Sequence, residues 1–150
     1  MPFSDKFTDI LFNLCRTTIK DLYLPLYSEV VVNYFLSYNQ PENIQYDSKI
    51  GYTALLFGNN DLVGSGCIVG TNIRRLFVLP NYQRAGFGTL ILKHLEQKSV
   101  ENNCNFLDLY AMINTIDFYK KLGYKEMGIC NYIVNKNCSV DYMRMSKYFD

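Results

Sequence analysis

One stretch of the chain joins an apolar strand, a proline and a glycine-containing loop to a helix. It reads Leu-Phe-Val-Leu-Pro-Asn-Tyr-Gln-Arg-Ala-Gly-Phe-Gly over residues 76–88. Pro80 has no N–H group and ends the strand, whereas Gly86 and Gly88 carry no Cβ atom to keep a bulky anion away from the backbone. Because the helix begins inside Gln83–Gly88, its first N–H groups lack partners within the helix. With the helix dipole, these groups predict a binding site for a diphosphate.

Two other phosphate-binding loops contain similar glycines, and the spacing distinguishes them. The loop of ATP- and GTP-binding proteins has Gly-x4-Gly-Lys-Ser/Thr, whereas Gly88 is followed by Thr89 and a leucine, so that interpretation fails. A dinucleotide loop has a third glycine where Ile91 stands. Asp108 lies at roughly the distance of the ribose-binding acid of such loops. It falls inside its own predicted strand, however, and the dinucleotide interpretation has little support.

The length and the charge exclude several classes of protein. A chain of 150 residues suits one domain, residues 1–150, that buries about two-thirds of its unfolded surface. The formal net charge is +1, and no basic run interleaves with aromatic residues, so nucleic acid is not expected as a partner. The sequence contains neither a secretory apolar segment nor an apolar run long enough to cross a bilayer. We therefore expect a cytoplasmic protein without a membrane partner.

The cysteines and the single histidine do not form a recognisable chemical motif. The cysteines are odd in number and contain no Cys-x-x-Cys pair, which argues against a disulfide framework and against a zinc site. Reduced thiols in the core are the better interpretation, and no metal is expected. His94 neighbours Ile91 and Leu95 on its predicted helix, which favours a packing or surface role. The cysteines are Cys15, Cys67, Cys104, Cys130 and Cys138.

The hydrophobic periodicity predicts a mixed α/β chain. Helices are predicted from Ser4 or Asp5 up to Pro25 and from Ser28 to residue 40, with a short helical turn over 41–48. The strands that follow alternate with one long and one short helix, which implies a parallel neighbour for the strand that carries the loop. The remaining predictions are strands over 52–57, 62–69, 73–79 and 106–111, helices over 84–101 and 114–122, and a final hairpin over 124–134 and 139–148.

The cassette Gln83-x-x-Gly86-x-Gly88, directly after Leu-Phe-Val-x-Pro, resembles the acetyl-CoA loop of the GCN5-related N-acetyltransferases (GNAT). The order of elements matches that family from the second helix onward. The resemblance implies the GNAT-like acyl-CoA N-acyltransferase fold: a mixed, mostly antiparallel central sheet flanked by helices on both faces. Family members usually begin with an edge strand before the first helix. Met1-Pro2-Phe3 leaves almost no room for it, so we expect this strand to be short or missing.

The resemblance also implies how acetyl-CoA, the expected cofactor, would be bound. The strand before the loop would bulge away from its neighbour so that its main chain pairs with the pantetheine arm. The N–H groups of the loop would hold the pyrophosphate. The alternative is a plain strand–loop–helix junction with a glycine cap. The residues assigned to acetyl-CoA are Leu76, Phe77, Val78, Gln83, Arg84, Ala85, Gly86, Phe87, Gly88 and Asn114.

A second motif lies downstream and resembles the Asn-x-x-x-Phe-Tyr-x-x-x-Gly-Phe/Tyr segment of one branch of the family. In this chain it runs from Asn114 to Tyr124. Its tyrosine commonly lies beside the CoA sulfur and protonates the departing thiolate, and Tyr119 occupies that position. A core aromatic is the alternative for Tyr119. Asn114 would either orient the cofactor or cap the short helix.

An amine must lose a proton before it can attack, so a base is expected near the sulfur. Asp108 aligns with an acidic residue that some family members use in this role, and it is the catalytic candidate beside Tyr119. An ion pair between Asp108 and Arg74 or Arg75 is an equally supported alternative. These arginines could instead meet an anionic group of the acceptor.

The acceptor side is less well defined by the sequence. Tyrosines on the N-terminal helices and on the last hairpin could line a pocket whose aromatic faces favour a cation, or they could simply be half-buried surface. These tyrosines are Tyr23, Tyr27, Tyr34, Tyr132 and Tyr142.

Together these features predict an N-acetyltransferase that transfers the acetyl group of acetyl-CoA directly to a primary amine of a small molecule or peptide. Direct attack needs no cysteine nucleophile. Two other functions stay open: a non-catalytic acyl-CoA-binding sensor or interaction module, and an acetyltransferase of protein N-termini or lysines. Either a monomer or a homodimer is compatible with the sequence.

Overall fold

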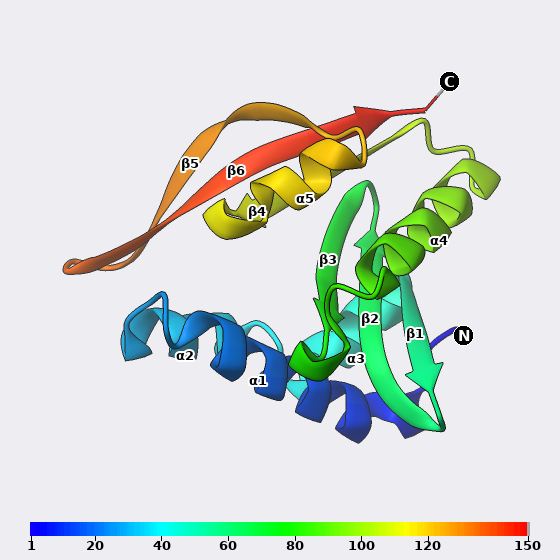
Figure 1. Ribbon diagram of the computed structural model, residues 1–150, viewed down its shortest axis with the longest axis horizontal. Helices are drawn as coiled ribbons and strands as arrows, with labels where there is room; N and C mark the ends of the chain where they lie inside the picture. Colours follow the sequence, from blue (N-terminus) through cyan, green and yellow to red (C-terminus); the bar gives the residue numbers. More distant parts are fainter. Residues whose placement is uncertain (150) are drawn as a thin grey trace.

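The computed structural model describes residues 1–149, and a six-stranded mixed sheet of order β1-β2-β3-β4-β6-β5 forms its centre (Figure 1). The predicted fold class is confirmed. The strands are β1 (Tyr52–Gly58), β2 (Asp61–Val69), β3 (Asn72–Val78), β4 (Phe106–Met112), β5 (Lys125–Asn135) and β6 (Cys138–Tyr148). The α-helices are α1 (Thr8–Tyr23), α2 (Glu29–Ser37), α3 (Pro41–Ile50), α4 (Phe87–Glu101) and α5 (Ile116–Lys121).

The strand pairing follows the predicted pattern in both halves of the sheet. Strands β1, β2 and β3 form an antiparallel meander, and β5 and β6 form the final hairpin. Strand β4 runs parallel to β3, as the strand–helix–strand order predicts. The last strand, β6, lies between β4 and β5 and pairs antiparallel with both.

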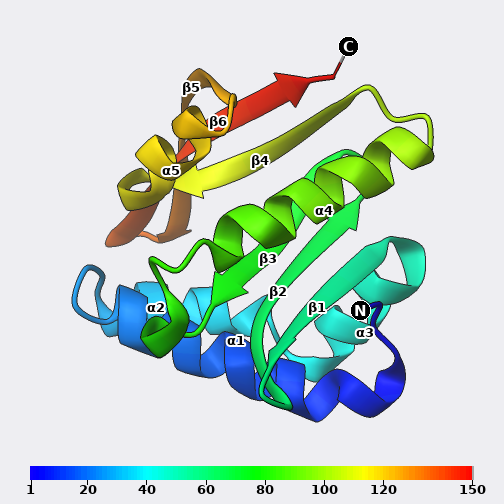
Figure 2. The same cartoon turned by 45° about the vertical axis from the view of Figure 1, so that its right-hand side comes forward.

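Helices cover both faces of the sheet, which confirms the predicted layering (Figure 2). On one face α4 buries Ile91, Leu92 and Leu95 in a cluster that includes residues of β4 and β6. On the other face α1 and α3 form a second cluster that includes Leu11 and Ile44. Burying one such side chain fully is worth about 1.5–3 kcal/mol. Among residues 1–149, no helix has the length and apolarity needed to cross a membrane.

The first edge strand is reduced to a single bridge between Pro2 and Ala54 of β1. The Phe3 N–H donates to Thr53 O at 3.0 Å, and the Leu55 N–H donates to Met1 O at 2.7 Å. The strand is therefore short and not missing. A 3₁₀ turn then leads directly into α1, which leaves no length for further pairing.

Helix α3 is longer than the short turn expected for residues 41–48. It runs for ten residues with Pro41 in its first turn, where a missing N–H costs no hydrogen bond. Ile44 and Asp47 are its buried residues. Asp47, which lies within the predicted range, pairs from this helix with Arg74 and Arg75 of β3.

Strands β3 and β4 pair at only one register position, Asn72 with Asp108. The Asp108 N–H also donates to Thr71 O at 2.8 Å. Beyond this point the two strands diverge, and β3 leads into the loop while β4 leads toward α5 (Figure 2). The sheet therefore opens on the side of the predicted acetyl-CoA site.

Candidate functional site

The loop after β3 is shaped by a proline turn and two left-handed residues. A 3₁₀ turn over Pro80–Tyr82 follows the strand, and the Gln83 side chain donates from Nε2 to Val78 O at 2.9 Å. Arg84 has a φ of 63° and Gly86 a φ of 86°. Gly86 is the N-cap of α4, so the helix begins at residue 87, later than the predicted residue 84.

This geometry leaves backbone donors at the start of a 15-residue helix. The Leu90 N–H donates to Gly86 O at 3.0 Å, so the N–H groups before it lack a partner within the helix. Left-handed residues in such a loop turn successive N–H groups toward one concave surface that suits an anion. The Gln83 N–H is already used, because it donates to Pro80 O at 3.3 Å. The available donors therefore lie after Gln83.

The two loop glycines serve different purposes. A Cβ atom at Gly86 would meet nothing within 4 Å, so its positive φ is the reason for glycine there. A Cβ atom at Gly88 would lie 3.2 Å from Cζ of Phe118 on α5. Gly88 thus lets the start of α4 approach α5, a packing reason that the sequence does not reveal.

The open edge of β3 lies beside this loop. The Leu79 N–H donates to Val63 O of β2 at 2.9 Å. Because successive N–H groups of a strand point to opposite edges, Phe77 also directs its main chain toward β2. Leu76 and Val78 direct theirs toward β4, which has diverged from β3 at this level. Of the three strand residues assigned to the cofactor, these two have main-chain groups on the open edge.

Tyr119 lies on α5, next to the start of α4. Its ring packs edge-to-face on Phe118 and Tyr124, with centroids 5.1 and 5.9 Å away. Burial raises the pKa of the Tyr119 phenol, and the nearby Tyr23 adds to this effect. The hydroxyl therefore keeps its proton at neutral pH. Phe118 links it to the loop, because this ring is also the neighbour of Gly88.

Asn114 does not cap α5. It lies exposed in the 3₁₀ turn Ile113–Thr115, and the N-cap position belongs to Thr115. The Thr115 hydroxyl donates to Met112 O at 2.7 Å and so closes the turn. The capping alternative for Asn114 is therefore wrong, because the 3₁₀ turn moves the start of the helix by two residues.

Asp108 is half-buried on β4 and accepts a hydrogen bond from the Thr71 hydroxyl at 3.2 Å. The ion-pair alternative for this residue is wrong, because Arg74 and Arg75 both pair with Asp47 of α3, at 3.2 and 2.7 Å. Side chains alternate between the two faces of a strand. Asp108 therefore lies on the face opposite to Leu107 and Leu109, which are buried in the cluster under α4 and α5.

The five tyrosines predicted for the acceptor side gather into one aromatic cluster around Phe35 of α2, a residue to which the sequence assigned no such role. Tyr34 stacks on Tyr132 across the gap between α2 and β5, with ring centroids 5.1 Å apart. The same buried cluster includes Met112 at the end of β4. Phe35 packs with centroid distances between 5.2 and 6.5 Å against Tyr23, Tyr27, Tyr34 and Tyr142.

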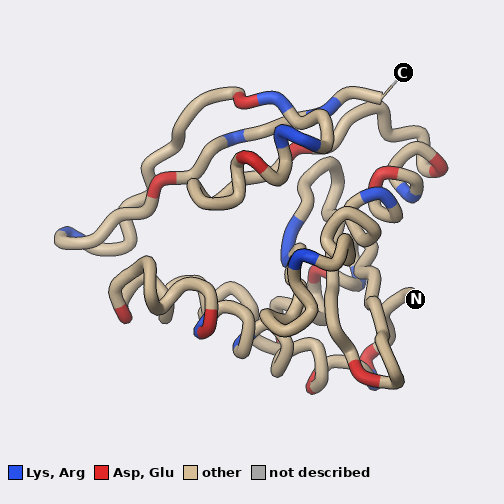
Figure 3. The backbone as a smooth tube through the Cα atoms, in the orientation of Figure 1, with Lys and Arg blue, Asp and Glu red and all other residues tan. Residues whose placement is uncertain are grey.

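His94 lies on α4, and Cys138 packs against the aromatic cluster. All five cysteines are free thiols, and burial raises the pKa of Cys15 to about 12. The exposed His94 exchanges a hydrogen bond of 2.7 Å between its Nε2 and the Tyr52 hydroxyl. Within residues 1–149, His, Cys, Asp and Glu side chains form no group of three that could hold a metal ion. Basic and acidic residues are both scattered along the backbone (Figure 3).

Comparisons with known proteins agree with this geometry. A family model of the acetyltransferase (GNAT) domain matches residues 23–147. The chain is 30% identical over 96 residues to the uncharacterised protein YyaT of Bacillus subtilis (strain 168), a match that covers 57% of this chain and 65% of that protein. The chain thus spans less than two thirds of this relative's length.

Two crystal structures share the fold at low sequence identity. One is described as a GCN5-related N-acetyltransferase, "Aminotransferase, Class-II", from Rhodopseudomonas palustris, with a TM-score of 0.89, 18% identity and coverage of 99% of this chain and 94% of that chain. The other is the PaiA N-acetyltransferase from Thermoplasma acidophilum in complex with coenzyme A, with a TM-score of 0.80, 19% identity and coverage of 98% and 96%. Because the family model matches well over half of the sequence, the chain belongs to the GNAT acetyltransferase family.

Proposed function

We propose that this protein is an N-acetyltransferase that transfers the acetyl group of acetyl-CoA directly to a primary amine of a small molecule or a peptide. One observation carries the proposal. The helix N-terminus at Gly86, the open edge of β3 and helix α5, which carries Tyr119, lie around the place where β3 and β4 diverge (Figure 2).

Acetyl-CoA supplies an activated acetyl thioester when it is bound. The main reason to expect that this chain binds acetyl-CoA is the loop after β3. The N–H groups after Gln83 would hold the pyrophosphate, because they start a long helix and the position of Gly86 is free of neighbouring protein atoms. Arg84, which is exposed on the same loop, would add positive charge. The main chain of Leu76 and Val78 would pair with the pantetheine arm as a strand does.

Tyr119 would donate its proton toward the departing sulfur. Its raised pKa keeps the phenol protonated, which a donor requires. A thiol of the cysteine type has a pKa of about 8.5, well below that of the phenol. A hydrogen bond from Tyr119 to the thiolate is therefore easier than complete proton transfer.

Asp108 would accept the proton of the amine, directly or through water. It lies where β3 and β4 still pair, on the face that carries α1 and α2. The aromatic cluster lies on that same face and is the proposed approach of the acceptor. The charge of Asp141 adds to burial in raising the pKa of Tyr27, so a carboxylate lies beside the cluster. Aromatic faces and a carboxylate both favour a cationic acceptor.

The experiment that tests the proposal combines cofactor binding with turnover. Calorimetry with CoA should show binding to the wild type and none to Gly86→Glu, which places bulk and negative charge at the helix N-terminus. Gly70→Glu is the matched control. Gly70 also has a positive φ, 62°, and an open Cβ position, but it lies at the far end of β3.

Turnover is measured as thiol release from acetyl-CoA across polyamines, aminoglycosides, amino acids and peptides. Release with one class of amine would support the proposal and identify the acceptor. CoA binding without release for any amine would show a non-catalytic sensor instead. Equal CoA affinity in Gly86→Glu and the wild type would place the cofactor elsewhere.

A further inference from the structure

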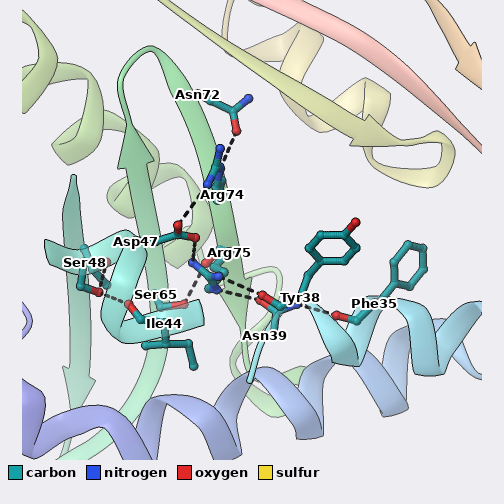
Figure 4. A network of polar contacts seen from close by, with 11 residues as sticks. Phe35, Tyr38, Asn39, Ile44, Asp47, Ser48, Ser65, Asn72, Arg74 and Arg75 are labelled. Atoms are coloured by element: carbon teal, nitrogen blue, oxygen red, sulfur yellow. Dashed lines mark hydrogen bonds and ion pairs between the residues drawn. The ribbon is translucent and has the colours of Figure 1, made fainter. Parts of the chain in front are cut away.

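Arg74 and Arg75 are consecutive in β3, yet both side chains reach the carboxylate of Asp47 (Figure 4). Arg74 Nη1 lies 3.2 Å from Oδ1, and Arg75 Nη1 lies 2.7 Å from Oδ2. In a regular strand two successive side chains point to opposite faces. The shared partner therefore marks an irregularity in β3.

The irregularity is a β-bulge. Ser65 of β2 pairs with Phe77 and Cys67 pairs with Arg74, so Arg75 and Leu76 together oppose one residue. Arg75 has a φ of 51°, in the left-handed region that non-glycine residues rarely adopt. The Ser65 hydroxyl donates to Arg75 O at 2.8 Å across the bulge.

The Arg75 side chain is held by three partners from the α2–α3 region. Nε donates to Asn39 Oδ1 at 2.8 Å, Nη1 to Asp47 Oδ2 at 2.7 Å, and Nη2 to Tyr38 O at 3.0 Å. Both ends of the ion pair are well covered, with 7% of the Arg75 side chain and 10% of the Asp47 side chain exposed. We call Arg75, Asp47 and Asn39 the α3 clamp.

The clamp lies where β3 leaves β4. The last position that pairs with β4 is Asn72, three residues before the bulge. After the bulge come Leu76 and Val78, which direct their main chain to the open edge. A bulge bends its strand and increases the local twist, so the conformation of Arg75 sets the course of this edge.

We propose that Arg75 is a positioning residue for the acetyl-CoA site. The α3 clamp holds residue 75 in its left-handed conformation, and this conformation directs the main chain of Leu76 and Val78 toward the cofactor. Arg75 acts through the backbone and does not itself touch the cofactor. The inference rests on the proposed function, because it assigns a role in acetyl-CoA binding.

A purely structural role is the competing explanation, in which the same contacts only anchor α3 to the sheet. Arg75→Ala and Arg75→Gly separate the two explanations because both remove the same side-chain contacts. They differ in the backbone: glycine adopts the left-handed conformation without the steric cost that alanine incurs, about 1–2 kcal/mol, a factor of 5–30 in a conformational equilibrium.

The experiment measures the Kd for CoA by calorimetry and the Tm of each variant. We expect Arg75→Gly to bind CoA on the order of tenfold more tightly than Arg75→Ala, with both weaker than the wild type. The order of the two Kd values is the readout that anchoring of α3 would not produce. Equal Kd values for the two variants, or a wild-type Kd for Arg75→Ala, would overturn the inference.

A second pair of variants covers the case in which Arg75→Ala does not fold. Asp47→Asn removes the ion pairs but keeps the Arg75 bonds to Asn39 and Tyr38. If Arg75 acts through its backbone conformation, adding Arg75→Gly to Asp47→Asn should restore part of the CoA affinity. If Arg75 only anchors α3 to the sheet, the added substitution should not restore it. Failure of the wild type to bind CoA would instead contradict the proposed function, so the two failures are distinguishable.

Discussion

At the residue scale, Tyr119 combines a packing ring with a hydroxyl suited to chemistry. The ring belongs to the cluster under α4 and α5. Its neighbour Tyr124 has a similar ring but a committed hydroxyl, which donates to Glu96 at 3.0 Å. The hydrogen bonds within residues 1–149 do not include one from Tyr119. Tyr119 and Tyr124 thus belong to one cluster, but the Tyr124 hydroxyl is engaged by Glu96 whereas the Tyr119 hydroxyl can donate to a bound molecule.

Tyr119→Phe should lower kcat by a factor of about 10²–10⁴, the usual contribution of a positioned proton donor. The dissociation constant for acetyl-CoA should change little, because the ring and the packing are kept. Steady-state kinetics and calorimetry measure the two quantities. Tyr124→Phe is the matched control: it should cost stability through Glu96 while leaving kcat nearly unchanged. A wild-type kcat in Tyr119→Phe would show that Tyr119 only packs.

Asp108→Asn should lower kcat/KM most strongly near neutral pH, where the amine is mainly protonated and needs a base. The loss should shrink as the pH approaches the pKa of the amine, about 10 for a lysine-like group, because the free amine then forms without help. Rates across this pH range test the prediction. Asp117→Asn, an exposed change on α5, is the control. If Asp108→Asn lowers kcat/KM by the same factor at every pH, Asp108 is not the base.

At the element scale, α4 connects the two halves of the sheet. The β3–β4 junction contributes one paired position, so other contacts must hold the halves together. Glu96 of α4 lies 3.1 Å from the Lys147 Nζ of β6. Lys147 also donates to Leu122 O at the end of α5, at 2.9 Å. This ion pair thus ties α4 to both β6 and α5.

Lys147→Met should lower the free energy of unfolding by about 1–3 kcal/mol, because the largely buried Glu96 loses a charged partner. Denaturant unfolding measures this. The matched control is Lys125→Met on the exposed start of β5, which should stay within about 0.5 kcal/mol of the wild type. If both changes have the same small effect, the Glu96 pair does not hold the halves together.

At the scale of the whole molecule, the aromatic cluster is the second connection between the halves. Tyr23 at the end of α1 contacts Phe35, and burial raises the pKa of Tyr23 from 10.0 to about 12. In the unfolded chain this phenol ionises near 10, whereas in the folded chain it stays neutral to about 12. Its contribution to stability is complete below pH 10 and is lost as the pH rises from 10 to 12.

The free energy of unfolding should therefore fall steeply above pH 10, with Tyr23 contributing about 1.4 kcal/mol per pH unit. Tyr23→Phe cannot ionise in either state, so its unfolding free energy should fall less steeply over the same range. Denaturant unfolding at a series of alkaline pH values measures the slopes. Tyr46→Phe, at a tyrosine that is 63% exposed, should keep the wild-type slope. Identical slopes in all three proteins would contradict the role of Tyr23.

The sequence by itself determined the features that depend on neighbouring residues. Alternation with period two predicted the hairpins, and helical periodicity predicted α1, α2 and α4. The proline and the glycines located the loop, because φ restrictions act on a residue regardless of what surrounds it. The family motif extended this to the fold class.

Only the tertiary structure decided which distant side chains meet. Asp47 is 28 residues from Arg75, and no local pattern indicates that it, and not Asp108, pairs with both arginines. Likewise Gly88 meets Phe118, and the five tyrosines meet around Phe35, only after the helices dock on the sheet. Such contacts depend on the direction in which each strand and helix points its side chains. A shift of one residue in strand register would turn those side chains to the other face of the sheet and abolish the contacts.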